Sequence, residues 1–125
     1  MSIDITLFNH LKTVSAVTDI FGSGDNIRIY PRTAPDAAST PYAVYFPISR
    51  DVTYSYEKRE DAERLMVQYS VFGSTYSQVR NGADAIMDAL EGCPQVSMVF
   101  HESEILLRDD GSNLFHIPLT VAAWK

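Results

Sequence analysis

The segment 64–92, RLMVQYSVFGSTYSQVRNGADAIMDALEG, contains a change of hydrophobic period that decides the fold class. In its first part, apolar residues recur at every second position, which is typical of a strand with one buried face. These residues are Leu65, Val67, Tyr69 and Val71. From residue 74 the period becomes helical, and Gly92 followed by Pro94 predicts the end of the helix. A strand that leads directly into an amphipathic helix predicts a domain in which α and β elements pack on each other.

The helix predicted over residues 74–92 has Ser74 as its N-cap and one apolar stripe that faces the core. The stripe consists of Tyr76, Val79, Ala83, Ile86 and Leu90. Gly82 lies in the middle of this helix, where glycine costs about 1 kcal/mol relative to alanine. We therefore expect the missing side chain of Gly82 to permit close packing.

Upstream of this segment, one helix and two strands are predicted. The helix carries Leu7, Phe8, Leu11 and Val14 on one face and continues as one more turn over residues 17–21. A short strand covers residues 27–30. A long strand then starts at Tyr42, and its alternation predicts that Tyr42, Val44, Phe46 and Ile48 face the core.

Downstream of the helix, a strand begins in residues 95–100, and its parity changes at a bulge or break between His101 and Glu104. The last strand, residues 114–124, has Phe115, Ile117, Leu119, Val121 and Ala123 facing the core. Pro118 has no N–H to donate, which predicts an edge strand or a kink there. The element order is α-β-β-β-α-β-β. We expect one α+β domain over residues 1–125, with an antiparallel sheet of about five strands and two helices on one face.

Composition and charge exclude several classes of protein. A net charge of −6 and a pI near 4.8 disfavour direct gripping of nucleic acid, because that binding relies on Lys and Arg at the phosphates. Cys93 is the only cysteine, so no internal disulfide can form. The first twelve residues lack the features of a signal peptide, and no apolar run reaches ~20 residues, so we expect a soluble protein in the cytoplasm.

Motifs for chemistry are weak throughout the chain. His101 and Glu102 point to opposite faces of a strand, and residues 108–113 lack the acidic spacing of a calcium loop. FGSG (residues 21–24) lacks the lysine of a phosphate-binding loop. We predict a protein that is not an enzyme, with no catalytic, cofactor-binding or metal-binding residues.

The long strand and its return strand exceed the size of the domain. Residues 42–56 would extend about 50 Å at ~3.3 Å per residue, whereas a domain of this size is roughly 36 Å across. The hairpin is therefore expected to project from the core, with Val52, Tyr54 and Tyr56 continuing the parity of Tyr42. Exposed tyrosines among polar residues are typical of interfaces. The alternative is that Pro47 breaks the strand and that residues 50–63 fold back as a loop.

Three stretches together resemble a known family. They are IRIYPRTAPDAASTPYAVYFPIS (27–49), VQYSVFGSTYSQVRNGADAIMDALEG (67–92) and the closing FHIPLTVAAW (115–124). In order and spacing, they are similar to the small tail-completion proteins of tailed bacteriophages and prophages, which include tail-to-head joining and tail-terminator proteins. The resemblance covers almost the whole chain.

The resemblance implies a structural virion protein that forms a ring, commonly hexameric, at the head-proximal end of the tail tube. Its implied partners are other copies of itself, the tail-tube protein and the head connector, with DNA passing through the lumen and no membrane. Implied localisation is the tail or neck of the virion, and the host cytoplasm during assembly. We expect the subunit interface to involve Arg50, Val52, Tyr54, Tyr56, Glu57, Lys58, Arg59, Glu60 and Asp61.

The proline-rich link over residues 31–41 is the second expected contact region. Pro31, Pro35 and Pro41 restrict its backbone, and a stiff loop loses less entropy on docking. Arg32, Pro35 and Asp36 are its expected partner-docking residues. The alternative for the link is a simple connection between strands. For the whole protein, the alternatives are a small ligand-binding or regulatory module that dimerises through its sheet, and a degenerate hydrolase.

Overall fold

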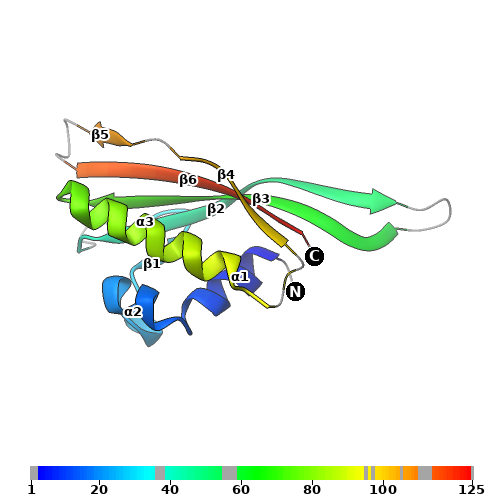
Figure 1. The fold of residues 1–125 in the computed structure, drawn as a ribbon, viewed down its shortest axis with the longest axis horizontal. Coiled ribbons are helices and arrows are strands. Elements are labelled where there is room, and N and C mark those ends of the chain that lie inside the picture. Colours follow the sequence, from blue (N-terminus) through cyan, green and yellow to red (C-terminus); the bar gives the residue numbers. More distant parts are fainter. Residues whose placement is uncertain are drawn as a thin grey trace.

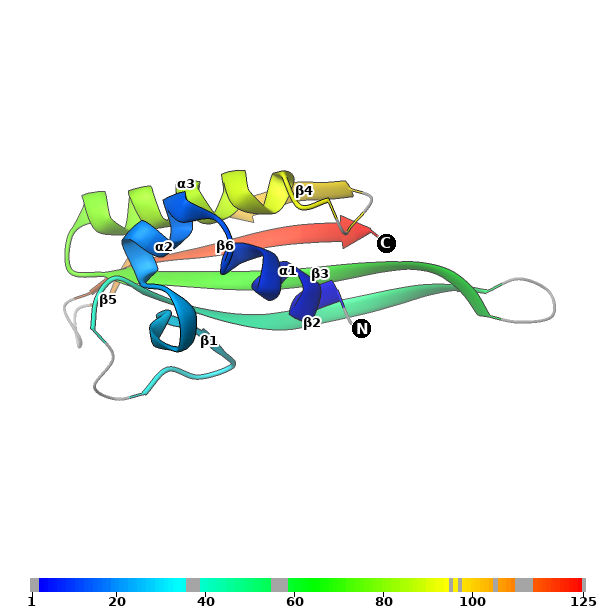
Figure 2. The ribbon, with the colours of Figure 1, turned by 90° about the horizontal axis from the view of Figure 1, so that it is seen from below.

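The computed structural model describes residues 3–35, 39–54, 59–94, 96, 98–104, 106–109 and 114–124, with the backbone alone for residues 3, 4, 25, 51–54, 59–63, 98–104 and 109. Three helices lie on one face of a twisted sheet (Figures 1 and 2). The helices are α1 (Ile3–Leu11), α2 (Ser15–Phe21) and α3 (Tyr76–Glu91), and a short 3₁₀ turn (Gly24–Asn26) follows α2. The strands are β1 (Ile29–Pro31), β2 (Tyr42–Tyr54), β3 (Arg59–Gly73), β4 (Met98–Glu104), β5 (Leu107–Asp109) and β6 (Leu114–Trp124).

The α+β class and the placement of the helices on one face are confirmed. The sheet order is β1-β2-β3-β6-β4, and β5 also pairs with β6. Two details differ from the expectation. Residues 15–21 form a separate helix instead of one more turn of α1, and β1 runs parallel to β2, so the sheet is mixed. The remaining pairs are antiparallel.

The core lies between the helices and the sheet. Leu7 and Leu11 of α1, Phe21 of α2 and Ile86 of α3 are fully buried there. The predicted parity is confirmed for β3 and β6, whose core residues include Leu65, Val67, Tyr69, Val71, Ile117, Leu119, Val121 and Ala123. Tyr69 pairs with Leu119 on one side and with Tyr45 on the other, which places all three positions on the helix-covered face.

The predicted parity of β2 is wrong. Ala43 and Tyr45 belong to the core, whereas Val44 lies on the opposite face and Ile48 is 49% exposed. Both faces of the run YAVYF are apolar, so alternation alone does not identify the core side. Tyr42 and Phe46 are likewise only partly buried.

The continuous parity from Tyr42 to Tyr56 is also wrong, because the strand contains a bulge. The pairing register shifts between Pro47 and Ser49, so that Phe46 pairs with Gln68 but Arg50 pairs with Leu65. A proline cannot donate to the ladder, which makes this position suited to an extra, unpaired residue. The bulge exchanges the two faces of β2 for the residues that follow it.

β6 runs through the interior of the sheet, so the prediction of an edge strand at Pro118 is wrong for the strand as a whole. Pro118 pairs with Ser70 of β3 on one side. On the other side, the pairing with β4 ends at Leu119 and the pairing with β5 begins at His116. Pro118 therefore lies opposite the interruption between β4 and β5, where its missing N–H is tolerated. The predicted bulge after His101 is confirmed.

Helix α3 begins one residue later than predicted, with Thr75 as its N-cap. The Thr75 hydroxyl accepts a hydrogen bond from the Gln78 backbone N–H (3.2 Å), and Gln78 Oε1 accepts one from the Ser74 backbone N–H (2.9 Å). Together these bonds satisfy two backbone donors at the start of the helix. Tyr76 is 49% exposed, so it is not part of the core stripe. The other predicted stripe residues are buried.

Gly82 lies where α3 packs closely against α2 and β3, as expected. A Cβ at this position would lie 2.9 Å from Phe21 Cζ and 3.1 Å from Val71 Cγ1. Phe21 and Val71 are themselves fully buried, so neither side chain has open space into which it can move.

Gly82→Ala is expected to destabilise the protein by about 1–3 kcal/mol, because overpacking outweighs the gain in helix propensity of about 1 kcal/mol. Gly92→Ala is the matched control. A Cβ at Gly92 meets only backbone oxygens, at 3.7 Å, so this change should be almost neutral. Urea denaturation of both variants measures the difference. Equal stability of the two variants would contradict the packing role of Gly82.

Candidate interaction surface

The sheet face opposite the helices, which we call the open face, carries a row of stacked rings. The Tyr42 and Phe72 rings have centroids 5.0 Å apart at 18°, and the Phe72 and His116 rings lie 4.3 Å apart at 9°. The row exists because Tyr42 pairs with Phe72, and Phe72 with His116, across three neighbouring strands. Each stacked pair stabilises the sheet by about 0.5–1.5 kcal/mol beyond burial. Burial also raises the pKa of the Tyr42 phenol above its ordinary value.

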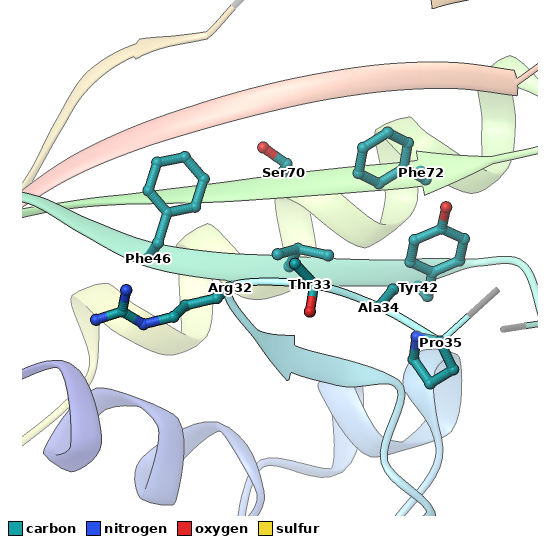
Figure 3. Close-up of a pocket in the computed structure, with 9 residues that line it drawn as sticks. Arg32, Thr33, Ala34, Pro35, Tyr42, Phe46, Ser70 and Phe72 are labelled. Carbon is teal, nitrogen blue, oxygen red and sulfur yellow. The ribbon is translucent and has the colours of Figure 1, made fainter.

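The beginning of the proline-rich link folds back over this face and encloses a groove of about 450 Å³ (Figure 3). The floor and far wall come from β2 and β3, and the near wall comes from the link. The lining residues are Arg32, Thr33, Ala34, Pro35, Tyr42, Val44, Phe46, Ser70 and Phe72. We use "the groove" for this set of residues.

A reversal of the chain at Arg32 places the link over the open face. Arg32 has φ = 68°, and the Thr33 N–H donates to the Pro31 carbonyl oxygen over 2.8 Å. The Arg32 N–H donates to the Tyr45 carbonyl oxygen over 2.9 Å, which ties the turn to β2. A positive φ at a residue other than glycine costs about 1–3 kcal/mol and is concentrated at functional sites.

Arg28 holds the other end of the link. Its Nε donates to the Pro41 carbonyl oxygen over 3.0 Å, and its terminal nitrogen donates to the Ile20 carbonyl oxygen over 2.8 Å. One side chain therefore joins α2 to the residue that precedes β2. This contact limits the movement of the link relative to the sheet.

The groove has a mixed lining, in which polar and apolar atoms expose about equal surface. Val44 is buried, and the rings of Tyr42, Phe46 and Phe72 are partly exposed. The buried Ser70 hydroxyl accepts a hydrogen bond from Gln68 Nε2 over 2.9 Å, so its polarity is satisfied locally. Arg32 is the one charged residue among the nine described lining residues, and its side chain extends past Phe46 along the groove (Figure 3).

The second surface is the end of the β2–β3 hairpin, which projects beyond the helices and beyond β6 in both views (Figures 1 and 2). β6 pairs with β3 only from Arg64 onward, where the Arg64 guanidinium lies over the Trp124 ring at 5.2 Å. Past this point β2 and β3 pair only with each other within the described residues, through Val52–Glu63 and Tyr54–Arg59. We call residues 51–54 and 59–63 "the arm".

The structure divides the predicted site residues between these surfaces. Val52, Tyr54, Arg59, Glu60 and Asp61 lie in the arm, and the exposed Arg50 lies at its root. Arg32 and Pro35 line the groove. Tyr56, Glu57, Lys58 and Asp36 lie outside the described residues.

Hydrophobic alternation does not identify the groove residues of β2, because it assigns Tyr42, Val44 and Phe46 to the core. The signal was present in the run YAVYF, since a strand that is apolar on both faces requires cover on both. The described part of the chain contains no cluster of three or more metal-ligating side chains. It also contains no helix with the length and apolar character needed to span a membrane.

Comparisons with known proteins give one family match and a likeness in fold to a solved structure. The family described as Tail completion protein gp17 matches residues 5–125. No curated protein matches the chain. Among solved structures, a chain from the "Virion of native gene transfer agent (GTA) particle" is similar, with a TM-score of 0.80 at 14% sequence identity. The match covers 98% of this chain and 93% of the other. At that identity the likeness shows a shared fold. With residues 5–125 matched, this chain belongs to the Tail completion protein gp17 family and has a structural role in a phage tail.

Proposed function

We propose that this chain assembles into a ring, of six copies, at the head-proximal end of the tail tube. The ring ends the growth of the tube and joins the tail to the head connector, and DNA passes through its lumen. Its partners are other copies of itself, the tail-tube protein and the connector protein. The assembled protein resides in the tail or neck of the virion, after assembly in the host cytoplasm. It acts as a structural component without catalysis.

The observation that carries this proposal is the projecting arm. Its five β3 residues extend the hairpin by roughly 16 Å past the last residue of β6 that pairs with β3. A two-stranded hairpin is at best marginally stable in water, so partner contacts would stabilise the arm. Family membership makes other virion proteins, including further copies of this chain, the natural partners.

The charge of the chain supports passage of DNA without binding. The sequence has sixteen acidic and ten basic residues, which gives a net charge of −6. DNA-binding surfaces hold phosphates through fixed Lys and Arg side chains. A lumen with excess carboxylates would repel phosphates at close range, within about 8–10 Å at physiological salt, and would allow DNA to slide.

A small ligand-binding module that dimerises through its sheet is the second candidate. The groove favours it, because its volume of about 450 Å³ lies within the range of ligand pockets, about 300–1,000 Å³. A ligand module would retain a bound small molecule and form a two-fold dimer. A tail-completion ring would do neither.

Native mass spectrometry and negative-stain electron microscopy of the purified chain, over a range of concentrations, test the proposal. We expect closed rings of six copies, with monomers at low concentration. Addition of tail tubes should shift the population toward rings, because binding to the tube end favours the assembled state. Monomers or two-fold dimers alone, even in the presence of tubes, would contradict it.

A further inference from the structure

We propose that the groove of one copy receives the arm of the next copy, an inference that rests on the ring proposed above. It specifies the receiving surface, which is formed by the link and the open face. The occupant is a second copy of this chain, through residues 51–54 and 59–63.

The positions of the two surfaces suit a head-to-tail contact. Tyr42 and Phe72, which line the groove, pair with each other at one end of the β2–β3 ladder. Tyr54 and Arg59 pair at its other end, in the arm. The two ends are separated by about 40 Å at ~3.3 Å per residue. A contact between different surfaces at opposite ends of a subunit is heterologous, and it closes a ring when repeated around an axis.

The chemistry of the two surfaces also matches. The groove presents partly exposed rings of Tyr42, Phe46 and Phe72 over the buried Val44. The arm contains Val52 and Tyr54, whose side chains are suited to contacts with the partly exposed aromatic rings of the groove. An arm residue inserted there would shield both surfaces from water.

The charges of the groove and of the arm are complementary. Arg32, the charged residue of the groove, is exposed, and among the described residues none forms a side-chain hydrogen bond or ion pair with it. The arm has four carboxylates and one cation in its sequence: Asp51, Arg59, Glu60, Asp61 and Glu63. The cationic groove of one copy therefore attracts the acidic arm of another, which guides association and register.

The first test places a carboxylate in the groove. Ala34→Glu adds bulk and a negative charge to the near wall, opposite an acidic arm. Ala16→Glu is the matched control, because Ala16 is exposed on α2, on the helix-covered side of the sheet. We expect Ala34→Glu to raise the protein concentration needed for ring formation by about tenfold or more, because a buried, unpaired charge is costly at an interface. Ala16→Glu should assemble like the unmodified chain.

The second test removes the cation of the groove. Arg32→Gly is chosen because glycine adopts a φ of 68° without strain, so the turn is retained. Ring assembly of the unmodified chain should weaken as salt is added, since salt screens the attraction. Arg32→Gly should assemble less well at low salt and show a smaller salt dependence. An unchanged salt dependence would contradict the role of Arg32.

The third test detects the contact directly, by a covalent cross-link, and keeps Tyr54 in place. Ala34→Cys and Thr53→Cys are each made in a Cys93→Ala background, so that each copy has one thiol. Mixing the two variants with a short bismaleimide should yield a covalent dimer that neither variant forms alone. Ala16→Cys mixed with Thr53→Cys should give no such product.

The outcomes separate this inference from the ring itself. Rings without the cross-link, together with normal assembly of Ala34→Glu, would overturn the groove as the receiving surface and leave the ring intact. The same result is expected if the arm instead pairs with the edge strand β1, or if a small molecule occupies the groove. A cross-link without rings would support the contact and overturn the ring. If neither forms, both proposals are wrong.

Discussion

Ile86→Ala should lower the free energy of unfolding by about 2–5 kcal/mol. Ile86 is fully buried on α3, within the cluster that joins the helices to β3 and β6. Truncation removes apolar contacts and leaves a cavity, and close-packed neighbours relax only in part. Denaturant unfolding at a concentration below the onset of assembly measures the loss as a lower midpoint at unchanged slope.

Tyr76→Ala is the control on the same helix. Tyr76 lies three residues before Val79 and shares the helical stripe in the sequence, yet it is 49% exposed. It is the first residue of α3, and side chains in a helix tilt toward the N-terminus, so its ring points past the end of the core. This substitution should cost less than about 1 kcal/mol. A cost below about 0.5 kcal/mol for Ile86→Ala would mean that the helix faces the other way.

The period of the hydrophobic residues correctly predicted the buried side of each helix or strand that has only one buried side. α1, α3, β3 and β6 each alternate between the core and a more polar surface, so their core residues could be read directly, from Leu7 and Leu11 to Leu119 and Val121. Strand β2, which contributes to the open face, does not follow this pattern. β2 packs Tyr45 into the core and Val44 under the link. Both faces of this strand are therefore apolar, and the alternation alone does not identify the face that is covered by the helices.

The groove and the parallel strand could not be predicted because they depend on contacts far apart in sequence. The link joins parallel strands by returning over the open face, which requires the turn at Arg32 and the hold of Arg28 on the Pro41 carbonyl. A positive φ at arginine is uncommon, and sequence statistics give no reason to expect it. The projection of the hairpin, in contrast, could be predicted because its two strand segments are longer than the domain is wide.

The arm is expected to contribute more to assembly than to the stability of one copy. It lies beyond the pairing of β6 with β3, where β2 and β3 pair only with each other among the described residues. Parity no longer explains why Val52 and Tyr54 are apolar, since the bulge after Pro47 interrupts it. Val52 and Tyr54 are nevertheless large apolar or aromatic residues in an otherwise polar, acidic arm, and leaving such a side chain in water forgoes roughly 1.5 kcal/mol or more.

The double change Tyr54→Ser with Tyr56→Ser should therefore abolish ring formation and yield tails that fail to join heads. The thermal midpoint of the monomer should remain almost unchanged, because the arm extends past the last residue of β3 that pairs with β6. Exposed ion pairs contribute little affinity, so the charges of the arm should not compensate for the loss of both rings. Lys12→Ser with Thr13→Ser, at exposed positions after α1, serves as a matched pair of surface changes that should assemble normally. Native mass spectrometry and a tail-joining assay measure the outcome. Normal assembly of the double tyrosine variant would show that the arm is not the joint between subunits. A large drop in the monomer's thermal midpoint would show instead that the arm is part of the folded core.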